Sequence, residues 1–443
     1  MTGPVQAVTF AYMTEAEKPR SWYKLDNAGK LYPALLNQRD TTLFRMTARM
    51  DNTVNVTRLN RALENIMVRF PYYNVHLMRG AFWYYFDESP RLPRAERDSR
   101  YPCMKMAVRK RTRFPFRVRA WRNRISIEYS HILTDGTGGF TFFTALLGEY
   151  TALGEGREEP YEGILHKSET PHREEFEDAF VRYLDKDIPQ PRREQKAFQY
   201  PGPKEARGVY WVTTGSLPYE DLAREAKSRS LTITEFLTAL LMEVFQDYLF
   251  DLEEGERKRK AAPIAICIPV NLRRIFPSRT MRNFFLSVTP YIDPRLGRYS
   301  FEEICDKVMH FMRTDMDRKF LSQQITRNVK GEMNLLARLL PVHLKDLFLP
   351  IVYRTFGKST YTTTLSNMGQ ITLPPEVAAH VKSIHFTPNP PSGKTKIKVG
   401  VCGYGNRVNI TFGRVTPSSR VEREFFRKIR RLGIPVKVES NIS

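Results

Sequence analysis

Residues 128–139 read EYSHILTDGTGG and place a histidine where a strand-like run gives way to a glycine-rich turn. His131 ends the run, and Asp135 and Gly136 follow it at four and five positions, before a helix-like segment. Strand ends that open into loops are common places for chemistry in α/β folds. A near-neutral imidazole can take a proton from a hydroxyl, thiol or amine. Asp135 can either orient that ring or turn away and pair with an arginine.

The other histidines lack this context, and we interpret them as surface residues or satisfied core residues. Typical residue frequencies put Asp at +4 and Gly at +5 after one of eight histidines by chance about three times in a hundred. The remaining seven are His76, His166, His172, His310, His343, His380 and His385.

Strand-like and helix-like segments alternate along the 443 residues, which indicates an α/β fold with mixed sheets. Single cores stop growing well below this length, so two halves are expected. Residues 1–155 form the first predicted half and 207–443 the second. The charged, proline-interrupted stretch 156–206 is the predicted connection, with a short helix near 173–184.

Local signals predict individual elements. Residues 42–50 and 74–86 each read as one strand, and 113–121 with 124–131 as a hairpin. In that hairpin we expect Arg117, Arg119 and Arg124 to face solvent.

Two helices show apolar stripes behind polar first turns. One lies in NVTRLNRALENIMVRFP (55–71), with Thr57 as its expected N-terminal cap. The other covers about 235–250, with Thr234 as its expected cap.

The net charge is +22, from 70 basic and 48 acidic residues. It gives information about the molecules that the protein can bind, and not about its fold. Nucleic acid, an anionic membrane surface, an acidic carrier protein and a polyanionic cofactor such as coenzyme A all fit it. No nucleic-acid-binding motif accompanies the basic patches, so nucleic acid is disfavoured, whereas peripheral contact with an anionic membrane stays open. A solvated basic surface is the alternative for each patch.

No apolar stretch approaches the roughly 18 residues needed to span a bilayer, and the N-terminus lacks the shape of a signal peptide. The four cysteines are far apart and form no C-x-x-C pair. These features predict a cytoplasmic protein without disulfides or a metal site.

The pattern H-x-x-x-D-G resembles the motif of the chloramphenicol-acetyltransferase-like superfamily, which includes peptide-synthetase condensation domains, plant acyltransferases and bacterial alcohol acyltransferases. WYKLDNAGKLYPA (22–34), FRMTARMD (44–51) and RFPYYNVHLMRGAFWYYF (69–86) resemble its bacterial alcohol O-acetyltransferase branch. IPVNLRRIFPSRTMRNFF (268–285) resembles the arginine-bearing strand end of the superfamily, and TLSNMG (364–369) its crossover strand. Ser130 replaces the second histidine of condensation domains, and the D-F-G-W-G signature of the plant enzymes is absent.

The resemblance implies two halves with the active site in a channel between them. His131 would be the general base that deprotonates the acceptor, which then attacks the donor thioester without an acyl-enzyme. Asp135 would be structural and pair with an arginine, for which Arg273 is the best match and Arg274 the second. Gly136 would keep the turn tight.

The resemblance also suggests where oxyanion and coenzyme A contacts lie. Ser366 and Asn367, or the nearby Thr363 and Thr364, can donate to a tetrahedral oxyanion, although an ordinary strand end explains this stretch equally well. The candidates for binding the coenzyme A phosphates are Arg279, Arg282 and Lys258 to Lys260.

Three functions follow. The leading one is transfer of an acyl group, with acetyl favoured, from a coenzyme A thioester to a small alcohol, with the thioester as co-substrate and no bound cofactor. The second is a stand-alone condensation-type enzyme that uses a carrier-bound acyl donor and an amine acceptor; thiol release from free acetyl-CoA separates the two. The third is a non-catalytic basic binding protein, which steeply salt-sensitive nucleic-acid binding would favour.

Overall fold

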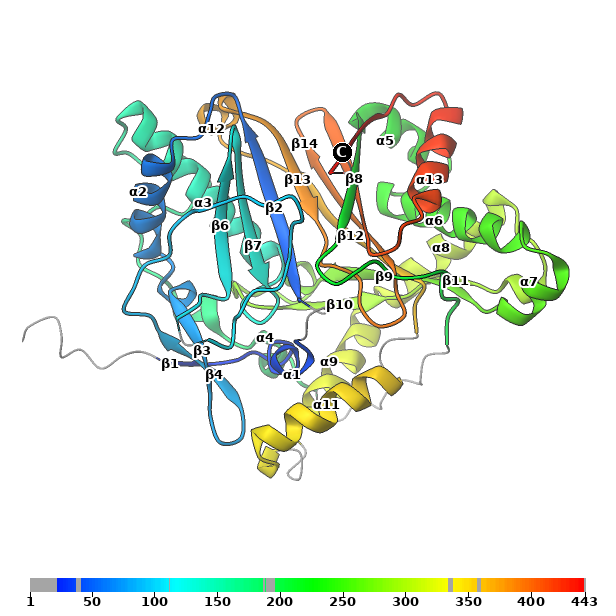
Figure 1. Cartoon of the computed structure of the whole chain (residues 1–443), viewed down its shortest axis with the longest axis horizontal. Coiled ribbons are helices and arrows are strands. Elements are labelled where there is room, and N and C mark those ends of the chain that lie inside the picture. Colours follow the sequence, from blue (N-terminus) through cyan, green and yellow to red (C-terminus); the bar gives the residue numbers. More distant parts are fainter. Residues whose placement is uncertain are drawn as a thin grey trace, which may run out of the picture.

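In the computed structural model, the strands form two large β-sheets that lie next to each other, and helices cover their outer sides (Figure 1). The structure describes residues 22–36, 41–110, 112–185, 188, 196–333, 338–356 and 360–441. Parallel and antiparallel strand pairs occur together in both large sheets. The predicted α/β class with two halves and mixed sheets is therefore confirmed.

The first large sheet carries His131 at the end of one of its inner strands. In spatial order its strands are β13 (Val381–Thr387), β2 (Leu43–Met50), β7 (Arg124–Ser130), β6 (Phe116–Trp121) and β5 (Glu96–Arg97). β6 and β7 form the predicted hairpin, and Arg122 in its turn has a φ of 51°. Because β7 has a neighbour on each side, the backbone leading to His131 is fixed.

A small sheet lies beside the first large one and contains β1 (Trp22–Lys24), β4 (Tyr84–Glu88) and β3 (Val75–Arg79). The stretch 74–86 was predicted as one strand, but it forms the antiparallel pair β3 and β4. The chain reverses at Gly80, whose amide donates to the Trp83 carbonyl at 3.0 Å. A side chain at Gly80 would crowd that carbonyl, so glycine permits the turn.

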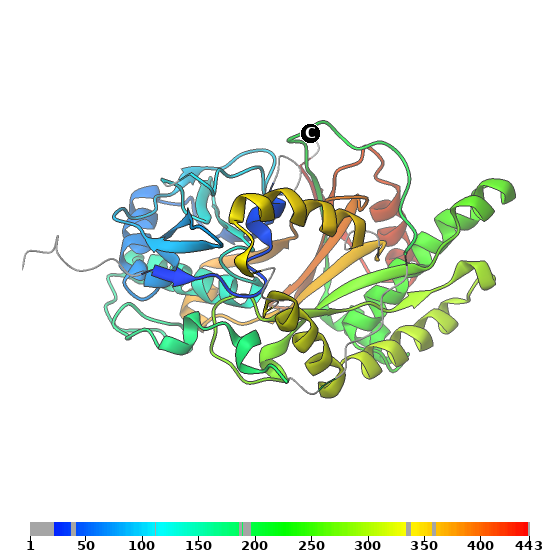
Figure 2. The same cartoon turned by 90° about the horizontal axis from the view of Figure 1, so that it is seen from below.

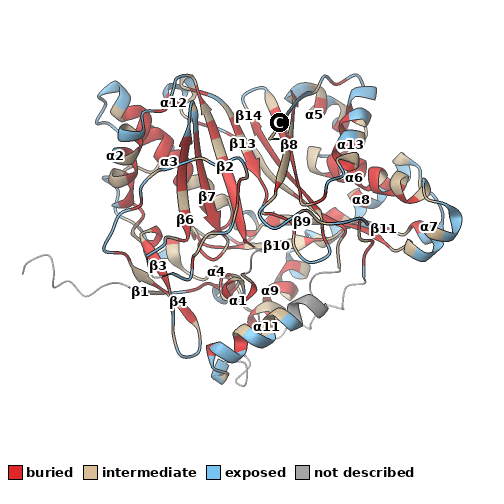
Figure 3. Cartoon of the chain, viewed as in Figure 1, coloured by how far each residue is buried: buried red, intermediate tan, exposed pale blue. Residues whose placement is uncertain are grey.

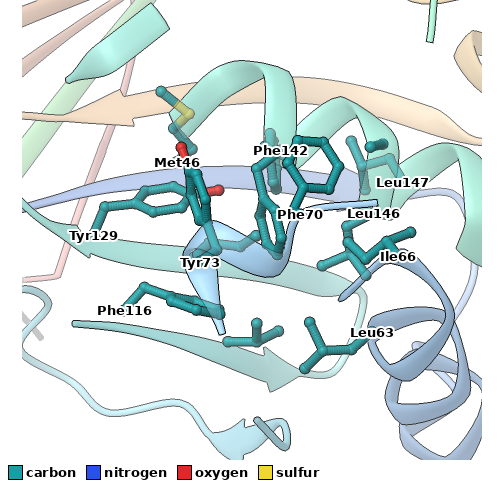
Figure 4. Close-up of a cluster of buried hydrophobic side chains, with 14 of the residues drawn as sticks. Met46, Leu63, Ile66, Phe70, Tyr73, Phe116, Tyr129, Phe142, Leu146 and Leu147 are labelled. Atoms are coloured by element: carbon teal, nitrogen blue, oxygen red, sulfur yellow. The ribbon is translucent and has the colours of Figure 1, made fainter. Parts of the chain in front are cut away.

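Apolar residues of helices α2 (Val56–Met67) and α3 (Gly136–Glu155) pack against the first large sheet (Figure 4). The Tyr73 and Phe142 rings stack with centroids 5.0 Å apart, and the fully buried Tyr129 of β7 meets the edge of both. Burying a large apolar side chain contributes about 1.5–3 kcal/mol. The strand that leads to His131 is thus anchored in the core by Tyr129.

Both predicted helix caps are displaced toward the N-terminus. Asn55, and not Thr57, caps α2, and its side chain accepts from the Arg58 amide at 3.0 Å. Thr232, and not Thr234, caps α6 (Ile233–Phe250) in a reciprocal capping box. In each case the earlier residue has the extended backbone that a cap requires, and the predicted residue already lies inside the helix.

The second large sheet is built by the C-terminal part of the chain. Its main path runs β10 (Phe285–Val288), β9 (Ile264–Asn271), β12 (Thr363–Ile371), β14 (Ile397–Tyr404), β15 (Arg407–Arg414), β8 (Trp211–Pro218) and β16 (Lys437–Ser440), and β11 (Tyr291–Ile292) pairs with β9. Its outer helices are α5 (Tyr219–Lys227), α6, α7 (Glu254–Lys260), α8 (Phe301–Asp315) and α13 (Arg420–Arg431).

Further short or peripheral helices complete the fold. They are α1 (Tyr32–Leu35), α4 (Ala179–Arg182), α9 (Arg318–Met333), α11 (Val342–Phe356), α12 (Pro375–Ala379) and the 3₁₀ segments η2 (Pro71–Tyr73), η3 (Arg173–Phe176), η4 (Leu272–Arg274) and η5 (Pro294–Leu296). Figure 2, seen from below, shows the yellow α11 next to the blue α1. No helix in the described ranges is both long and apolar enough to cross a bilayer.

One strand of the second half belongs to the first sheet. β13 pairs antiparallel with β2, so the first sheet is completed by residues far along the chain. The TLSNMG stretch was expected to resemble a crossover strand, but it lies in β12, between β9 and β14 of the second sheet. The strand that enters the first sheet is therefore β13.

The hairpin arginines do not all face solvent as predicted. Glu128 of β7 is fully buried, and Arg117 Nε donates to its carboxylate at 2.6 Å, with Arg119 Nε at 3.7 Å. Arg45 of β2 completes the group, with 3.2 Å between its Nη1 and the Glu128 carboxylate. Arg124 is exposed, as expected. The buried carboxylate draws the two arginines inward, because an unpaired buried charge is costly.

Candidate active site

His131 follows the last residue of β7, and its backbone is fixed by the neighbouring strand. The His131 amide donates to the Thr42 carbonyl at 3.0 Å, just before β2. The hydroxyls of Thr42 and Ser130 lie 3.1 Å apart, and Thr42 has a φ of 55°. The chain therefore presents the imidazole at the end of the sheet in one defined direction.

Aromatic rings from three different elements surround the imidazole. The Phe44 ring of β2 lies with its centroid 4.7 Å from that of His131, and the Tyr32 ring of α1 stacks on it at 5.6 Å and 25°. Phe285 of β10 lies at 5.9 Å. The residue as a whole is nevertheless partly exposed, whereas its Nδ1 is buried and has no hydrogen-bond partner in the described part of the chain.

The imidazole is held neutral. Desolvation is the main cause that lowers the pKa of His131 to about 4, and the nearby Lys398 cation lowers it further. Asp135 and the Asn283 side chain oppose this shift. At neutral pH the ring can therefore accept a proton, which a protonated imidazole cannot do.

Asn283 connects His131 to the N-terminal segment. Its Nδ2 donates to the His131 carbonyl at 2.8 Å and to Asp26 Oδ2 at 3.0 Å. Asp26 also accepts from the Gly29 amide at 2.6 Å and is almost fully buried, which raises its pKa despite the nearby Arg282 cation. Sequence reasoning missed both residues, although the D-N-A-G stretch at 26–29 carries a turn signal.

The Asp135 carboxylate accepts from Arg273 and from two backbone amides. It caps α3, accepting from the Gly138 amide at 3.0 Å, and accepts from the Phe284 amide at 2.8 Å. Arg273 contacts both carboxylate oxygens, at 2.8 Å from Nη1 and 3.3 Å from Nη2. Arg274, the second choice of partner, is exposed. Asp135 thus joins the helix after His131 to the start of β10.

Glycines allow close packing at the start of α3. A Cβ on Gly136 would lie 2.7 Å from Met368 Sδ of β12, and one on Gly138 would overlap the Met281 carbonyl oxygen. Thr134 Oγ1 donates to the same carbonyl at 2.6 Å. The loop before β10 therefore rests directly on the first turn of α3.

The proposed oxyanion donors lie on β12, which Met368 brings against Gly136. Asn367 is partly committed, because its Nδ2 donates to Thr234 Oγ1 at 2.9 Å and its Oδ1 accepts from the Gly369 amide. Ser366 is partly exposed.

The two alternative threonine donors differ in their surroundings. Thr363 is buried and donates to the Ile397 carbonyl at 2.6 Å, whereas Thr364 is partly exposed.

The predicted coenzyme A ligands lie in two separate places, the loop before β10 and helix α7. Arg282 is buried and its guanidinium donates to the Lys24 carbonyl, so its charge does not face solvent at the mouth of a channel. Arg279 is exposed on the loop before β10. Lys258 and Lys260 lie on α7, far from β7 (Figure 1), and pair with glutamates one turn earlier.

The wall of a cavity of about 520 Å³ includes Tyr32 and Phe285, which also contact the imidazole. Helices α1, α4, α9 and α11 and strand β10 enclose it. Figure 3 shows α11 with much of its surface exposed, whereas the sheets are mostly buried. Sequence reasoning did not identify the residues that line this cavity, because they come from segments that are distant in sequence.

No protein-family model matches the chain, and no curated protein does so. Several solved structures match over nearly its whole length. TRI101 from F. graminearum, complexed with coenzyme A and deoxynivalenol, has 10% identity and a TM-score of 0.64, covering 94% of this chain and 99% of that one. The TRI3 trichothecene 15-O-acetyltransferase from Fusarium sporotrichioides has 11% identity and a TM-score of 0.59, covering 96% and 99%.

A third match is the first condensation domain of the CDA synthetase, with 14% identity and a TM-score of 0.55, covering 93% of this chain and 95% of that domain. At these identities the likeness concerns the fold. The chain therefore has the two-lobed fold of chloramphenicol-acetyltransferase-like acyltransferases and condensation domains, and the predicted resemblance is confirmed at that level.

Proposed function

We propose that this protein, which has the fold of acetyltransferases and condensation domains, is an acyltransferase that moves an acyl group from a thioester to an alcohol. The observation that carries the proposal is the neutral imidazole of His131 at the end of β7, whose ring contacts Tyr32 and Phe285 in the wall of a large cavity. The Asp135–Arg273 pair fixes the turn that follows it. Free coenzyme A thioester is the proposed donor, supported by the presence of coenzyme A in the TRI101 structure.

In the proposed mechanism His131 is the general base. One ring nitrogen takes the proton of the acceptor hydroxyl while the oxygen attacks the thioester carbonyl carbon. The tetrahedral oxyanion then collapses, the C–S bond breaks, and the imidazolium returns the proton to the leaving thiolate. The products are an ester and a free thiol, and the imidazole is neutral again.

The charges around the site support this sequence of proton transfers. The Lys398 cation disfavours a resting imidazolium, and it also favours negative charge on a developing oxyanion. Ser366 and Asn367 are the proposed hydroxyl and amide donors to that oxygen. Asp135 is a positioning residue, because its carboxylate is occupied by Arg273 and two backbone amides.

The proposal is tested with a panel of acyl-CoAs against alcohols and amines, scored by the release of free thiol. His131→Ala should lower turnover by about 10²-fold or more, because general-base catalysis contributes roughly that factor. His385→Ala is the matched control, since His385 is also partly exposed and burial lowers its pKa to about 4. Equal turnover in the parent and the His131 variant would exclude the mechanism.

The same panel separates the alternatives. Condensation domains share the fold, so a carrier-bound acyl donor with an amine acceptor is the second candidate. Transfer from an acylated carrier protein, with no thiol release from free acyl-CoA, would select it. A salt-sensitive nucleic-acid complex without any acyl transfer would select the non-catalytic binding protein.

A further inference from the structure

The cavity bordered by Tyr32 and Phe285 has a polar side as well as apolar walls. Its size falls in the range of small-molecule sites. Its apolar lining includes Leu31, Tyr32, Trp83, Phe180, Phe285, Leu286, Leu340, Phe348 and Leu349. Tyr32 and Phe285 also contact the imidazole, so the cavity extends to the aromatic rings that surround the proposed base.

The polar side is one face of α9. Gln324, Arg327 and Asn328 stand at positions i, i+3 and i+4, and all three line the cavity. Gln324 as a whole residue is only 7% exposed. Within the described ranges, neither the Gln324 amide nor the Arg327 guanidinium has a hydrogen-bond or ion-pair partner in the protein. Both groups can therefore donate hydrogen bonds to a ligand in the cavity.

The other two cations of the cavity have protein partners. Lys30 Nζ lies 3.8 Å from Asp178 Oδ2. Lys345 Nζ donates to the Phe82 carbonyl at 2.8 Å and lies 3.5 Å from the centroid of the Trp83 ring. Arg327 is therefore the lining cation without a partner in the described part of the chain, and its planar fork matches a carboxylate.

We infer that the cavity binds a substrate with an apolar body and a single terminal carboxylate, which Arg327 and Gln324 hold while the reacting end lies at His131. The inference rests on the proposed function and specifies its substrate class. Either the acceptor alcohol or the acyl group of the donor can carry this carboxylate. The several phosphate charges of coenzyme A would need several unpaired cations, and α9 supplies one.

Binding to the full-length protein tests the inference without turnover. Calorimetry with decanoate and with 1-decanol should show that the parent prefers the carboxylate. Arg327→Gln should weaken decanoate binding by about tenfold or more, because charge-assisted hydrogen bonds are the strong ones, and leave decanol binding within about twofold. Arg327→Lys keeps the charge but loses the fork, so it should restore affinity in part. Arg274→Gln, at an exposed arginine, is the matched control.

Steady-state kinetics then show which substrate carries the carboxylate. With acetyl-CoA as donor, Arg327→Gln should raise the KM for 10-hydroxydecanoate but not for 1-decanol if the acceptor carries it. With 1-decanol as acceptor, it should raise the KM for glutaryl-CoA but not for butyryl-CoA if the acyl group carries it. Either pattern supports the inference.

Three results would overturn it. They are unchanged decanoate binding by the Arg327→Gln variant, equal weakening of decanoate and decanol, and a raised KM for acetyl-CoA itself. The last would assign Arg327 to the coenzyme A phosphates. If no acyl transfer is found with any pair of substrates, the proposed function fails, and the calorimetry still decides whether the cavity recognises a carboxylate.

Discussion

Replacing Arg273 with alanine removes five hydrogen bonds that hold the turn after His131. The guanidinium donates twice to Asp135 and once each to the Asn271 side chain and the carbonyls of Thr280 and Arg282. Only 5% of the Asp135 side chain is exposed, so the change leaves a buried carboxylate without its counter-charge. The expected loss of unfolding free energy is about 3–5 kcal/mol, the usual cost of breaking a buried pair from one side.

A double-mutant cycle with Asp135→Asn isolates the pair. Asparagine still caps a helix well and accepts from one amide, so this variant should lose only about 1–3 kcal/mol. The Arg273→Ala, Asp135→Asn double variant has no buried charge. It should be at least about 2 kcal/mol more stable than the sum of the single changes predicts.

The assay is urea-induced unfolding followed by fluorescence, with acyl transfer measured on the same preparations. Arg274→Ala is the control, because Arg274 is exposed and should change stability by less than about 0.5 kcal/mol. Additive losses in the cycle, or a loss below about 1 kcal/mol for Arg273→Ala alone, would refute the reasoning.

Two further predictions concern charge and space at the site. Because the pKa of His131 is lowered to about 4, kcat/KM should stay level from neutral pH to about pH 5 and fall through pH 4 as the base is protonated. Lys398→Met removes a positive charge near the imidazole, so the acidic fall in kcat/KM should move to higher pH. An unchanged position of that fall would contradict the role of Lys398. Gly138→Ala should destabilise the protein by roughly 2 kcal/mol or more in thermal unfolding and lower activity, because its Cβ would overlap the Met281 carbonyl. Gly255→Ala in α7 meets open space and should be neutral or stabilising; equal effects of the two glycine changes would contradict this account.

The arrangement around His131 could be predicted because its signals are local. A strand, a histidine, an Asp-Gly turn and a helix follow one another within about thirty residues, and each has its own pattern. The choice of Arg273 came from a resemblance and not from physics, since Arg274 has the same chemistry. The backbone of η4 decides between them by turning Arg273 inward.

Features that depend on distant segments could not be predicted. Arg117 and Arg119 alternate like solvent-facing residues, yet the loop that contains Asp98 and Cys103 covers them, and Cys103 donates its amide to Glu128 at 2.8 Å. Likewise nothing in the sequence near Arg282 indicates that Lys24, 258 positions earlier, accepts its hydrogen bond. A charged side chain is expected at the surface from its charge alone, but a buried partner in another segment can hold it in the interior.

The pairing of β13 with β2 has a consequence for biosynthesis. During translation β2 is made early, and its hydrogen-bonding edge stays open until more than three hundred further residues have left the ribosome. An open strand edge is a template for wrong pairing with other chains, and pairs so distant in sequence form slowly. We therefore expect the N-terminal lobe to finish folding only after synthesis of nearly the whole polypeptide, and we expect nascent chains to be most prone to wrong pairing during that interval.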